Sequence, residues 1–368
     1  MTGSAEAAAL DAEILERIDA WHSSGTDLGD DGFNDLARRI FAYQLRWNVP
    51  YARYCAAFGI TLDSLPAQWS DIPPVPAAAY KEAALATFDP SQAARTFVTS
   101  GTTQGVGGRH YMDKTALYDA ASLAAFDRFA LAGAPALRYF NLVPNPADRP
   151  DSSLGYMMGH VCAQRGDGRT GWYVRNDDIF IHAFVRDVRD AIDERRPAFI
   201  AATAFSLLHV VEHCAQQNVR LPLASGSRIM ETGGFKGRTR SVPRDELYDR
   251  AAALFGIDAN AIFAEYGMTE LTSQYYDSAT SRSESVRVKI SPPWLRSRVV
   301  GPNGKTLPDG TVGALAHVDL ANRSSCVAVL TEDLGVAVAG CIVLIGRDHG
   351  ATLRGCSLDA EELQTALQ

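Results

Sequence analysis

The chain has 368 residues, of which 46% are hydrophobic and 21% are charged, and its formal net charge is −8. This composition excludes a disordered chain, a collagen-like chain and a small disulfide-stabilised scaffold. At about 100–200 residues per domain, the length predicts two or three folding units. The mildly acidic balance argues against non-specific nucleic-acid binding, which needs a positive field.

The N-terminal segment is acidic and has no apolar core, so no signal peptide is expected. No apolar run approaches the roughly 20 residues of a membrane span. The longest run, residues 336–345, is predicted to be one core strand. The six cysteines show neither a CxxC pair nor zinc-ligand spacing. We therefore expect a soluble cytoplasmic protein without a structural metal site.

The predicted elements change in character along the chain. Residues 1–92 form a helical N-terminal region, because apolar side chains recur there at helical spacing before a proline-rich connection. Residues 93–294 alternate short apolar runs with helical stretches, which predicts an α/β core. Residues 295–345 contain closely spaced turns, which predict a small antiparallel barrel or sheet. Residues 346–368 form a polar tail that carries Cys356.

Within the α/β core, the apolar runs are expected to be strands of a largely parallel sheet, since helical stretches separate them. These runs cover residues 95–99, 138–143, 198–202 and 261–265.

A cluster of hydroxyl and glycine residues follows the first of these strands. It consists of Thr99, Ser100, Gly101, Thr102 and Thr103. Backbone N–H groups at glycines and the hydroxyls of Ser and Thr can together bind phosphate. The segment is neither a Walker A loop nor a GxGxxG turn. Its composition fits a flexible surface loop equally well.

A second motif, Ala-Glu-Tyr-Gly-Met-Thr-Glu over residues 264–270, follows another predicted strand. Tyr266 can stack on a base, Thr269 can contact a phosphate, and Glu270 can bind Mg²⁺ through oxygen. The simpler interpretation is a strand end that leads into a helix capped by Thr269 or Glu270.

A third candidate is the glycine-rich stretch that contains Gly233 and Gly234. Glycines allow the backbone to approach a flat ligand closely, but a tight loop between a strand and a helix explains them as well.

The fourth candidate is Cys356, which is close in sequence to Arg347 and Arg354. Positive neighbours lower the pKa of a thiol and so increase its reactive thiolate fraction. Most free cysteines are instead small buried apolar residues.

The order of the motifs TSGTT, GG, YGMTE, TEDLG and GRD resembles that of the adenylate-forming superfamily of acyl-CoA synthetases, adenylation domains and luciferase. The stretches PDSSL, ETGGFKG, EYGMTEL and RGCSL more narrowly resemble the acyl-protein synthetases of the LuxE type. Those are the fatty-acid-activating subunits of the bacterial bioluminescence reductase complex. The similarity extends from about residue 40 to the end. It implies the superfamily's large-domain fold, with layered α/β subdomains and a small β-barrel, but without the full C-terminal lid domain.

The resemblance implies roles for residues that contact the triphosphate. The loop of residues 99–103 would hold the β- and γ-phosphates, Thr269 would contact the α-phosphate, and Glu270 would bind Mg²⁺. Related enzymes have a lysine after this loop, whereas Arg109 is the nearest cation here. A guanidinium can replace an ammonium at a phosphate.

The resemblance also implies a nucleoside site. Tyr266 would stack on adenine, with Gly233 and Gly234 lining the same slot. Asp333 would bind the ribose hydroxyls, and Arg347, at the hinge position, would also reach the ribose.

Cys356 matches the cysteine that receives the acyl group in the acyl-protein synthetases. The lid lysine of ordinary synthetases has no counterpart, because no lysine follows Lys305. An acyl-protein reductase subunit is the partner that the resemblance implies.

The sequence therefore predicts a ligase that forms a carbon–sulfur bond. It would use ATP and Mg²⁺ to convert a long-chain fatty acid, or another carboxylic acid, to acyl-AMP and then to a cysteine thioester. The alternatives are a ligase that loads CoA or a carrier protein with an acyl or aryl group, and a non-catalytic nucleotide-binding module. The first alternative differs from the prediction in the final acceptor of the acyl group. The second differs in that no carboxylate is activated.

Overall fold

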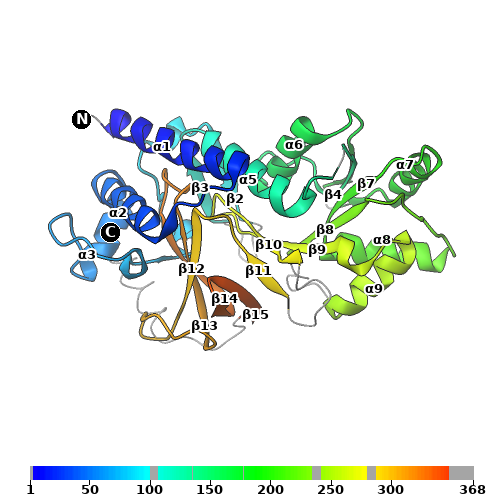
Figure 1. Cartoon of the computed structure of the whole chain (residues 1–368). Helices are drawn as coiled ribbons and strands as arrows, with labels where there is room; N and C mark the ends of the chain where they lie inside the picture. The colour runs from blue at the N-terminus through cyan, green and yellow to red at the C-terminus, as the bar shows by residue number, and fades with distance from the viewer. Residues whose placement is uncertain are drawn as a thin grey trace. The chain divides into compact units, whose positions relative to one another are not determined.

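The structure of the protein is a computed structural model that describes residues 3–99, 107–134, 136–176, 178–233, 242–279 and 287–347. It divides the chain into two compact units, each drawn from segments that are separated in the sequence (Figure 1). Unit 1 comprises Met1–Ala125, Met268–Gln274 and Val288–Gln368, and unit 2 comprises Phe126–Gly267 and Tyr275–Arg287. No helix in the described ranges is long and apolar enough to cross a membrane.

Unit 1 begins with helices that each bury one face. They are α1 (Gly3–Ser24), α2 (Gly29–Trp47), α3 (Val49–Ala57), α4 (Ala79–Glu82) and α5 (Ala116–Ala125), with short 3-10 turns η1 (Trp69–Asp71) and η2 (Pro90–Gln92). In α1, Leu10, Ile14 and Ile18 are buried, and their spacing of four residues places them on one helix face. Trp21 continues this face, and its ring meets that of Trp294 edge-on at a centroid distance of 5.2 Å.

The larger sheet of unit 1 is mainly antiparallel. Its strands are β1 (Val75–Pro76), β11 (Val288–Ile290), β12 (Leu295–Val300), β13 (Val312–Asp319), β14 (Ala328–Val338) and β15 (Cys341–Arg347). Within unit 1 the strand order is β12-β13-β14-β15-β11, with antiparallel neighbours throughout, and β1 pairs with β14 in parallel. Of these strands, β12, β13, β14 and most of β15 lie in residues 295–345, where closely spaced turns predict antiparallel pairing.

The prediction of one core strand over residues 336–345 is wrong. The run contains a turn at Ala339 and Gly340, whose φ angles are 49° and 79°. Val338 pairs with Cys341 across this turn. Two consecutive positive φ angles match the twist of a two-residue hairpin. The apolar run therefore forms the end of β14 and the start of β15.

The strand predicted at residues 95–99 forms, but outside a parallel sheet. β2 (Arg95–Val98) pairs antiparallel with β3 (Arg109–Met112) in a separate two-stranded sheet. Parallel pairing needs a crossover connection of a dozen or more residues, usually a helix. The short connection from β2 to β3 makes the two strands a hairpin.

Unit 2 contains the parallel sheet that the alternation of strands and helices predicts. Its strands are β4 (Arg138–Pro144), β5 (Gly171–Arg175), β6 (Asp178–Ile179), β7 (Ala198–Thr203), β8 (Arg228–Thr232), β9 (Ile262–Tyr266) and β10 (Tyr275–Asp277). Within unit 2 their order is β10-β9-β8-β7-β4-β5-β6. The pairs from β9 to β5 are parallel, and β10 and β6 join the two ends antiparallel.

Helices cover this sheet and complete its core. Unit 2 contains α6 (Ser153–Arg165), α7 (Ile181–Asp193), α8 (Ala204–Gln216) and α9 (Arg244–Phe255), the π-helical segment η3 (Phe126–Leu131) and the 3-10 turn η4 (Ala259–Ala261). Apolar side chains of α7, α8 and α9 pack against the strands from β4 to β9 in one cluster. In Figure 1, α8 and α9 lie side by side, and their residues are in contact. Thr203 and Ser206 form a capping box that begins α8 directly after β7.

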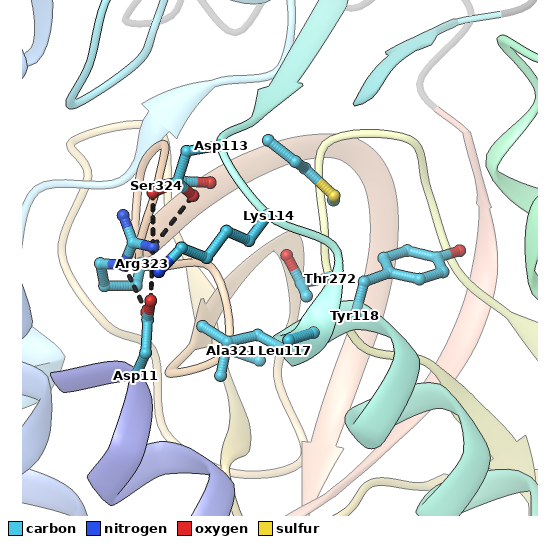
Figure 2. Close-up of a pocket in the computed structure, with 11 residues that line it drawn as sticks. Asp11, Asp113, Lys114, Leu117, Tyr118, Thr272, Ala321, Arg323 and Ser324 are labelled. Carbon is cyan, nitrogen blue, oxygen red and sulfur yellow. Dashed lines mark hydrogen bonds and ion pairs between the residues drawn. The ribbon is translucent and has the colours of Figure 1, made fainter. Parts of the chain in front are cut away.

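A buried ion-pair cluster ties the start of unit 1 to its sheet. Arg323 lies between β13 and β14 and is 1% exposed. Its Nε donates to Asp11 of α1 at 2.7 Å, and its Nη2 donates to Asp113, which follows β3, at 2.8 Å. Figure 2 shows Asp11 and Asp113 converging on this guanidinium, with Lys114 beside them. A buried charge of this kind is stable only while its partners remain in place.

Two histidines of unit 1 are fully buried, and burial shifts their titration. Burial lowers the pKa of both His110 and His317 to about 4, from an ordinary value of 6.5. Ser297 Oγ lies 2.8 Å from His317 Nδ1. The folded protein therefore keeps both rings neutral at a pH where the unfolded chain protonates them.

We expect Arg323→Met to lower the free energy of unfolding by about 3–5 kcal/mol, because Asp11 and Asp113 would lose their buried counter-charge. Urea denaturation measures this difference. Arg39→Met is the matched control: Arg39 also pairs with a carboxylate of α1, Glu13, but its side chain is 44% exposed. The control should cost less than about 1 kcal/mol. Equal losses in the two variants would contradict this account of the cluster.

We expect the stability of the protein to fall as the pH drops from 6.5 towards 4, since the unfolded chain then binds a proton at His317 that the folded form excludes. This group alone contributes a loss of about 2 kcal/mol between about pH 7.5 and about pH 5. His317→Asn removes it, so the difference in stability between the two pH values should shrink in urea denaturation. An unchanged difference would show that His317 titrates normally.

Candidate functional site

The connection between β2 and β3 begins with the cluster of hydroxyl and glycine residues 99–103 (the hydroxyl-rich segment), and hydrogen bonds join the two ends of this connection, Thr99 and Gly108. Thr99 N donates to Gly108 O at 2.9 Å, and Gly108 N donates to Thr99 Oγ1 at 2.8 Å. A Cβ atom at Gly107 would lie 2.6 Å from both Thr99 O and Val98 Cγ1, so no larger residue fits there. The hydroxyl of Thr99 thus helps to hold the two ends of the β2–β3 connection together.

His110, the second residue of β3, connects this hairpin to the segment that contains Thr269 and Glu270. His110 Nδ1 lies 2.7 Å from Thr269 O, and its Nε2 lies 3.0 Å from Asn322 Oδ1. Asn322 Nδ2 in turn donates to Glu270 O at 2.9 Å. All four residues belong to unit 1. The strand that leaves the hydroxyl-rich segment and the Thr269-Glu270 segment are therefore directly bonded.

The same segment is also held at its other end. The carboxylate of Asp319 accepts hydrogen bonds from Thr272 N, Ser273 N and Ser273 Oγ, each at 2.8 Å, and from Ala321 N at 3.1 Å. Burial raises the pKa of Asp319 to about 6, and these donors oppose the shift. The segment from Thr269 to Ser273 is thus fixed through both its carbonyl and its amide groups.

Glu270 is the candidate ligand for Mg²⁺. Glu270 is 7% exposed, and its backbone carbonyl accepts a hydrogen bond from Asn322 Nδ2. The described residues contain no group of three or more His, Cys, Asp or Glu side chains arranged for a metal. Mg²⁺ is commonly held by one or two carboxylates together with substrate phosphates and water. The carboxylate of Glu270 would be one ligand in that mode.

Arg109 is exposed at the start of β3, directly after the two glycines. It lies in register with Val98, one residue before Thr99. A guanidinium at this position is next to the joined ends of the β2–β3 connection and open to a ligand.

The candidate adenine-binding residues occur in unit 2, at the carboxyl ends of its parallel strands. β8 ends at Thr232, Gly233 follows with a φ of 70°, and β9 ends at Tyr266. Thr232 Oγ1 donates to the carboxylate of Glu265. Ligands of open α/β sheets bind at the carboxyl ends of the strands, and the placement of Gly233 and Tyr266 agrees with that rule.

The candidate ribose-binding residues occur in unit 1. Asp333 of β14 and Arg347 of β15 are direct cross-strand partners. Asp333 N donates to Thr331 Oγ1 at 3.0 Å, which fixes the backbone of Asp333 in this irregular part of the strand. The pairing brings together two residues that are separated in the sequence.

Several candidates lie outside the described residues: Ser100, Gly101, Thr102, Thr103, Gly234 and Cys356. For Arg347 only the backbone is described.

Sequence analysis missed the polar residues that hold the site segments, namely His110, Asn322 and Asp319. The stretch Asp-Leu-Ala-Asn-Arg-Ser-Ser over residues 319–325 gave no distinguishing signal, because polar residues between two apolar strands are typical of a surface turn. Its partners are distant in the sequence, so only the structure shows that these side chains are buried.

Solved structures share this fold at low sequence identity. A 2-hydroxyisobutyryl-CoA ligase, solved with 2-HIB-AMP and CoA, aligns with a TM-score of 0.65 at 16% identity, covering 89% of this chain and 71% of that one. ATP-bound MatB from Rhodopseudomonas palustris aligns with a TM-score of 0.50 at 14% identity, covering 71% of this chain. This chain spans about half (49%) of MatB. The predicted fold of the adenylate-forming enzymes is confirmed.

Sequence comparison narrows the relationship. A long-chain-fatty-acid–luciferin-component ligase from Aliivibrio fischeri is 21% identical over 306 residues, which cover 82% of this chain and 78% of that protein. The profile of the family described as "Acyl-protein synthetase, LuxE" matches residues 33–365. Because that match includes most of the chain and all of the candidate site residues, this protein belongs to the LuxE family of acyl-protein synthetases.

Proposed function

We propose that this protein activates a long-chain fatty acid with ATP and transfers the acyl group to its own Cys356 as a thioester. The observation that carries this proposal is the direct bonding of the Thr269-Glu270 segment to the strand that follows the hydroxyl-rich segment. It supports the proposal because Thr99 and the Thr269-Glu270 segment belong to the same unit of the fold. Membership of the family and the name of the relative from Aliivibrio fischeri support the substrate class.

The first step joins the carboxylate to the nucleotide. A carboxylate oxygen attacks the α-phosphorus of ATP, the bond to the bridging oxygen of the β-phosphate breaks, and pyrophosphate leaves. The chain contributes mainly by positioning the groups and neutralising charge. Thr269 and the segment of residues 99–103 would bind phosphates, and Arg109 would supply the cation next to that segment.

Glu270 would hold Mg²⁺, which neutralises phosphate charge when it is bound. Tyr266 and the glycines Gly233 and Gly234 would hold adenine, and Asp333 and Arg347 would hold the ribose. Orientation of the nucleoside matters because the attacking and leaving oxygens must be in line at the α-phosphorus.

The second step transfers the acyl group within the chain. The thiolate of Cys356 attacks the acyl carbon of the adenylate, a carbon–sulfur bond forms, and AMP leaves with the electron pair of the broken carbon–oxygen bond. An acyl-protein reductase subunit, in the cytoplasm, would accept this thioester. Acyl-AMP, the product of the first step, is a mixed anhydride that reacts with water. The site therefore has to exclude water until the acyl group is transferred.

We expect wild-type protein incubated with ATP, Mg²⁺ and a fatty acid to gain one acyl mass that neutral hydroxylamine removes. Cys356→Ser should gain no such mass but keep acid-dependent ATP–pyrophosphate exchange, because only the acceptor is changed. Intact-mass spectrometry measures the adduct. Cys341→Ser is the matched control, since Cys341 is a partly exposed cysteine of β15. A hydroxylamine-labile adduct on Cys356→Ser would refute the assignment, and CoA-dependent AMP release by that variant would favour a CoA ligase.

We expect Glu270→Gln to slow ATP–pyrophosphate exchange by about 100-fold, because the neutral amide binds Mg²⁺ weakly and stabilises less charge. Excess Mg²⁺ should restore part of the rate. Glu332→Gln, at an exposed position of β14, is the control and should leave the rate within about twofold. Exchange that is absent from the wild type with every carboxylic acid tested would favour a non-catalytic nucleotide-binding module.

A further inference from the structure

His110 and Asn322 each lie within hydrogen-bond distance of one of two consecutive backbone carbonyls of the candidate site, Thr269 O and Glu270 O. Both residues are almost completely buried, at 0% and 1% exposure. A neutral imidazole carries one N–H, and at Nδ1 of His110 this group donates to Thr269 O, 2.7 Å away. Asn322 Nδ2 donates to the next carbonyl along the chain, Glu270 O, at 2.9 Å. The two side chains are neighbours, since His110 Nε2 lies 3.0 Å from Asn322 Oδ1.

This arrangement fixes the orientation of the two peptide groups that flank the Cα atom of Glu270. Thr269 O and Glu270 O are the carbonyls on either side of the Glu270 backbone. When both are bonded to buried side chains, rotation about the φ and ψ angles of Glu270 breaks at least one bond. The direction in which the Glu270 side chain leaves the backbone is thus set by His110 and Asn322.

The backbone of Asn322 is also held by hydrogen bonds. Gln44 Nε2 donates to Asn322 O at 2.8 Å and to Arg323 O at 3.1 Å, and Val327 N donates to Gln44 Oε1 at 2.8 Å. The neighbouring Arg323 is fixed by its pairs with Asp11 and Asp113 (Figure 2). The amide of Asn322 is therefore a rigid reference point for the segment that it bonds.

We propose that His110 and Asn322 are positioning residues for the adenylation step, which orient Thr269 and Glu270 relative to the strand leaving the hydroxyl-rich segment. Neither residue contacts the substrate. Both act through the backbone of Thr269 and Glu270. This inference rests on the proposed function, because the reaction that benefits from the orientation is the attack on the α-phosphorus.

The test compares Asn322→Ala, His110→Ala and the double variant with wild type in ATP–pyrophosphate exchange. Each single variant should lower kcat by about 10- to 100-fold while the KM for the fatty acid changes by less than about threefold, since an error in position affects the transition state most. The double variant should lose at most about threefold more kcat than the slower single variant, because both residues fix the same backbone, that of Glu270.

Asn48→Ala is the matched control. Asn48 is equally buried, and its Nδ2 donates to Ser325 O at 3.1 Å in the same turn, but it has no bond to Thr269 or Glu270. It should lower the melting temperature as Asn322→Ala does and leave kcat within about threefold. A loss of kcat in Asn48→Ala equal to that in Asn322→Ala would reduce the effect to general stability and overturn the proposal.

Hydrogen–deuterium exchange of the backbone provides a readout that does not depend on activity. Asn322→Ala and His110→Ala should speed exchange at residues 269–274, and Asn48→Ala should not. If wild type lacks pyrophosphate exchange, the proposed function fails, and protection of residues 269–274 alone then decides whether His110 and Asn322 orient the segment. Unchanged protection in both variants, or unchanged kcat in an active protein, would overturn the inference.

Discussion

The buried polar turn of residues 319–325, between β13 and β14, is the feature on which unit 1 depends. Asp319 accepts from the segment at Thr272, Asn322 bonds to Glu270 O, and Arg323 pairs with Asp11 and Asp113. Each of these buried groups has a large cost of desolvation, which only its specific partners offset. The turn therefore permits one arrangement of α1, β3 and the Thr269-Glu270 segment.

This arrangement separates two tasks in the candidate site. Several of the residues expected to contact the nucleotide lie at strand ends: Thr99 and Gly233 follow β2 and β8, and Tyr266 is the last residue of β9. The residues that hold them are buried and bond to backbone atoms, as His110 and Asn322 do. Backbone bonding suits this task, because it fixes a segment without occupying the side chains that would meet a ligand.

Local patterns predict many of the elements but not their partners. The parallel strands β4, β7 and β9 form where apolar runs between helical stretches predict them. The run over residues 336–345 instead forms a hairpin with a turn at Ala339 and Gly340. The pattern misses this turn because neither residue has a polar side chain. β2 pairs with β3 in a hairpin, since a short connection cannot make a parallel crossover.

The sequence by itself determined the fold class, the order of the site motifs and the family, because all three depend on residue type and spacing along the chain. Tertiary structure alone decided that His110, Asn322 and Asp319 hold the Thr269-Glu270 segment, and that Asp333 pairs with Arg347. The physical reason is that a polar side chain can be buried only where the fold supplies its hydrogen-bond partner. Here the partners of His110 lie 159 and 212 residues away, a separation at which sequence pattern carries no information about contact.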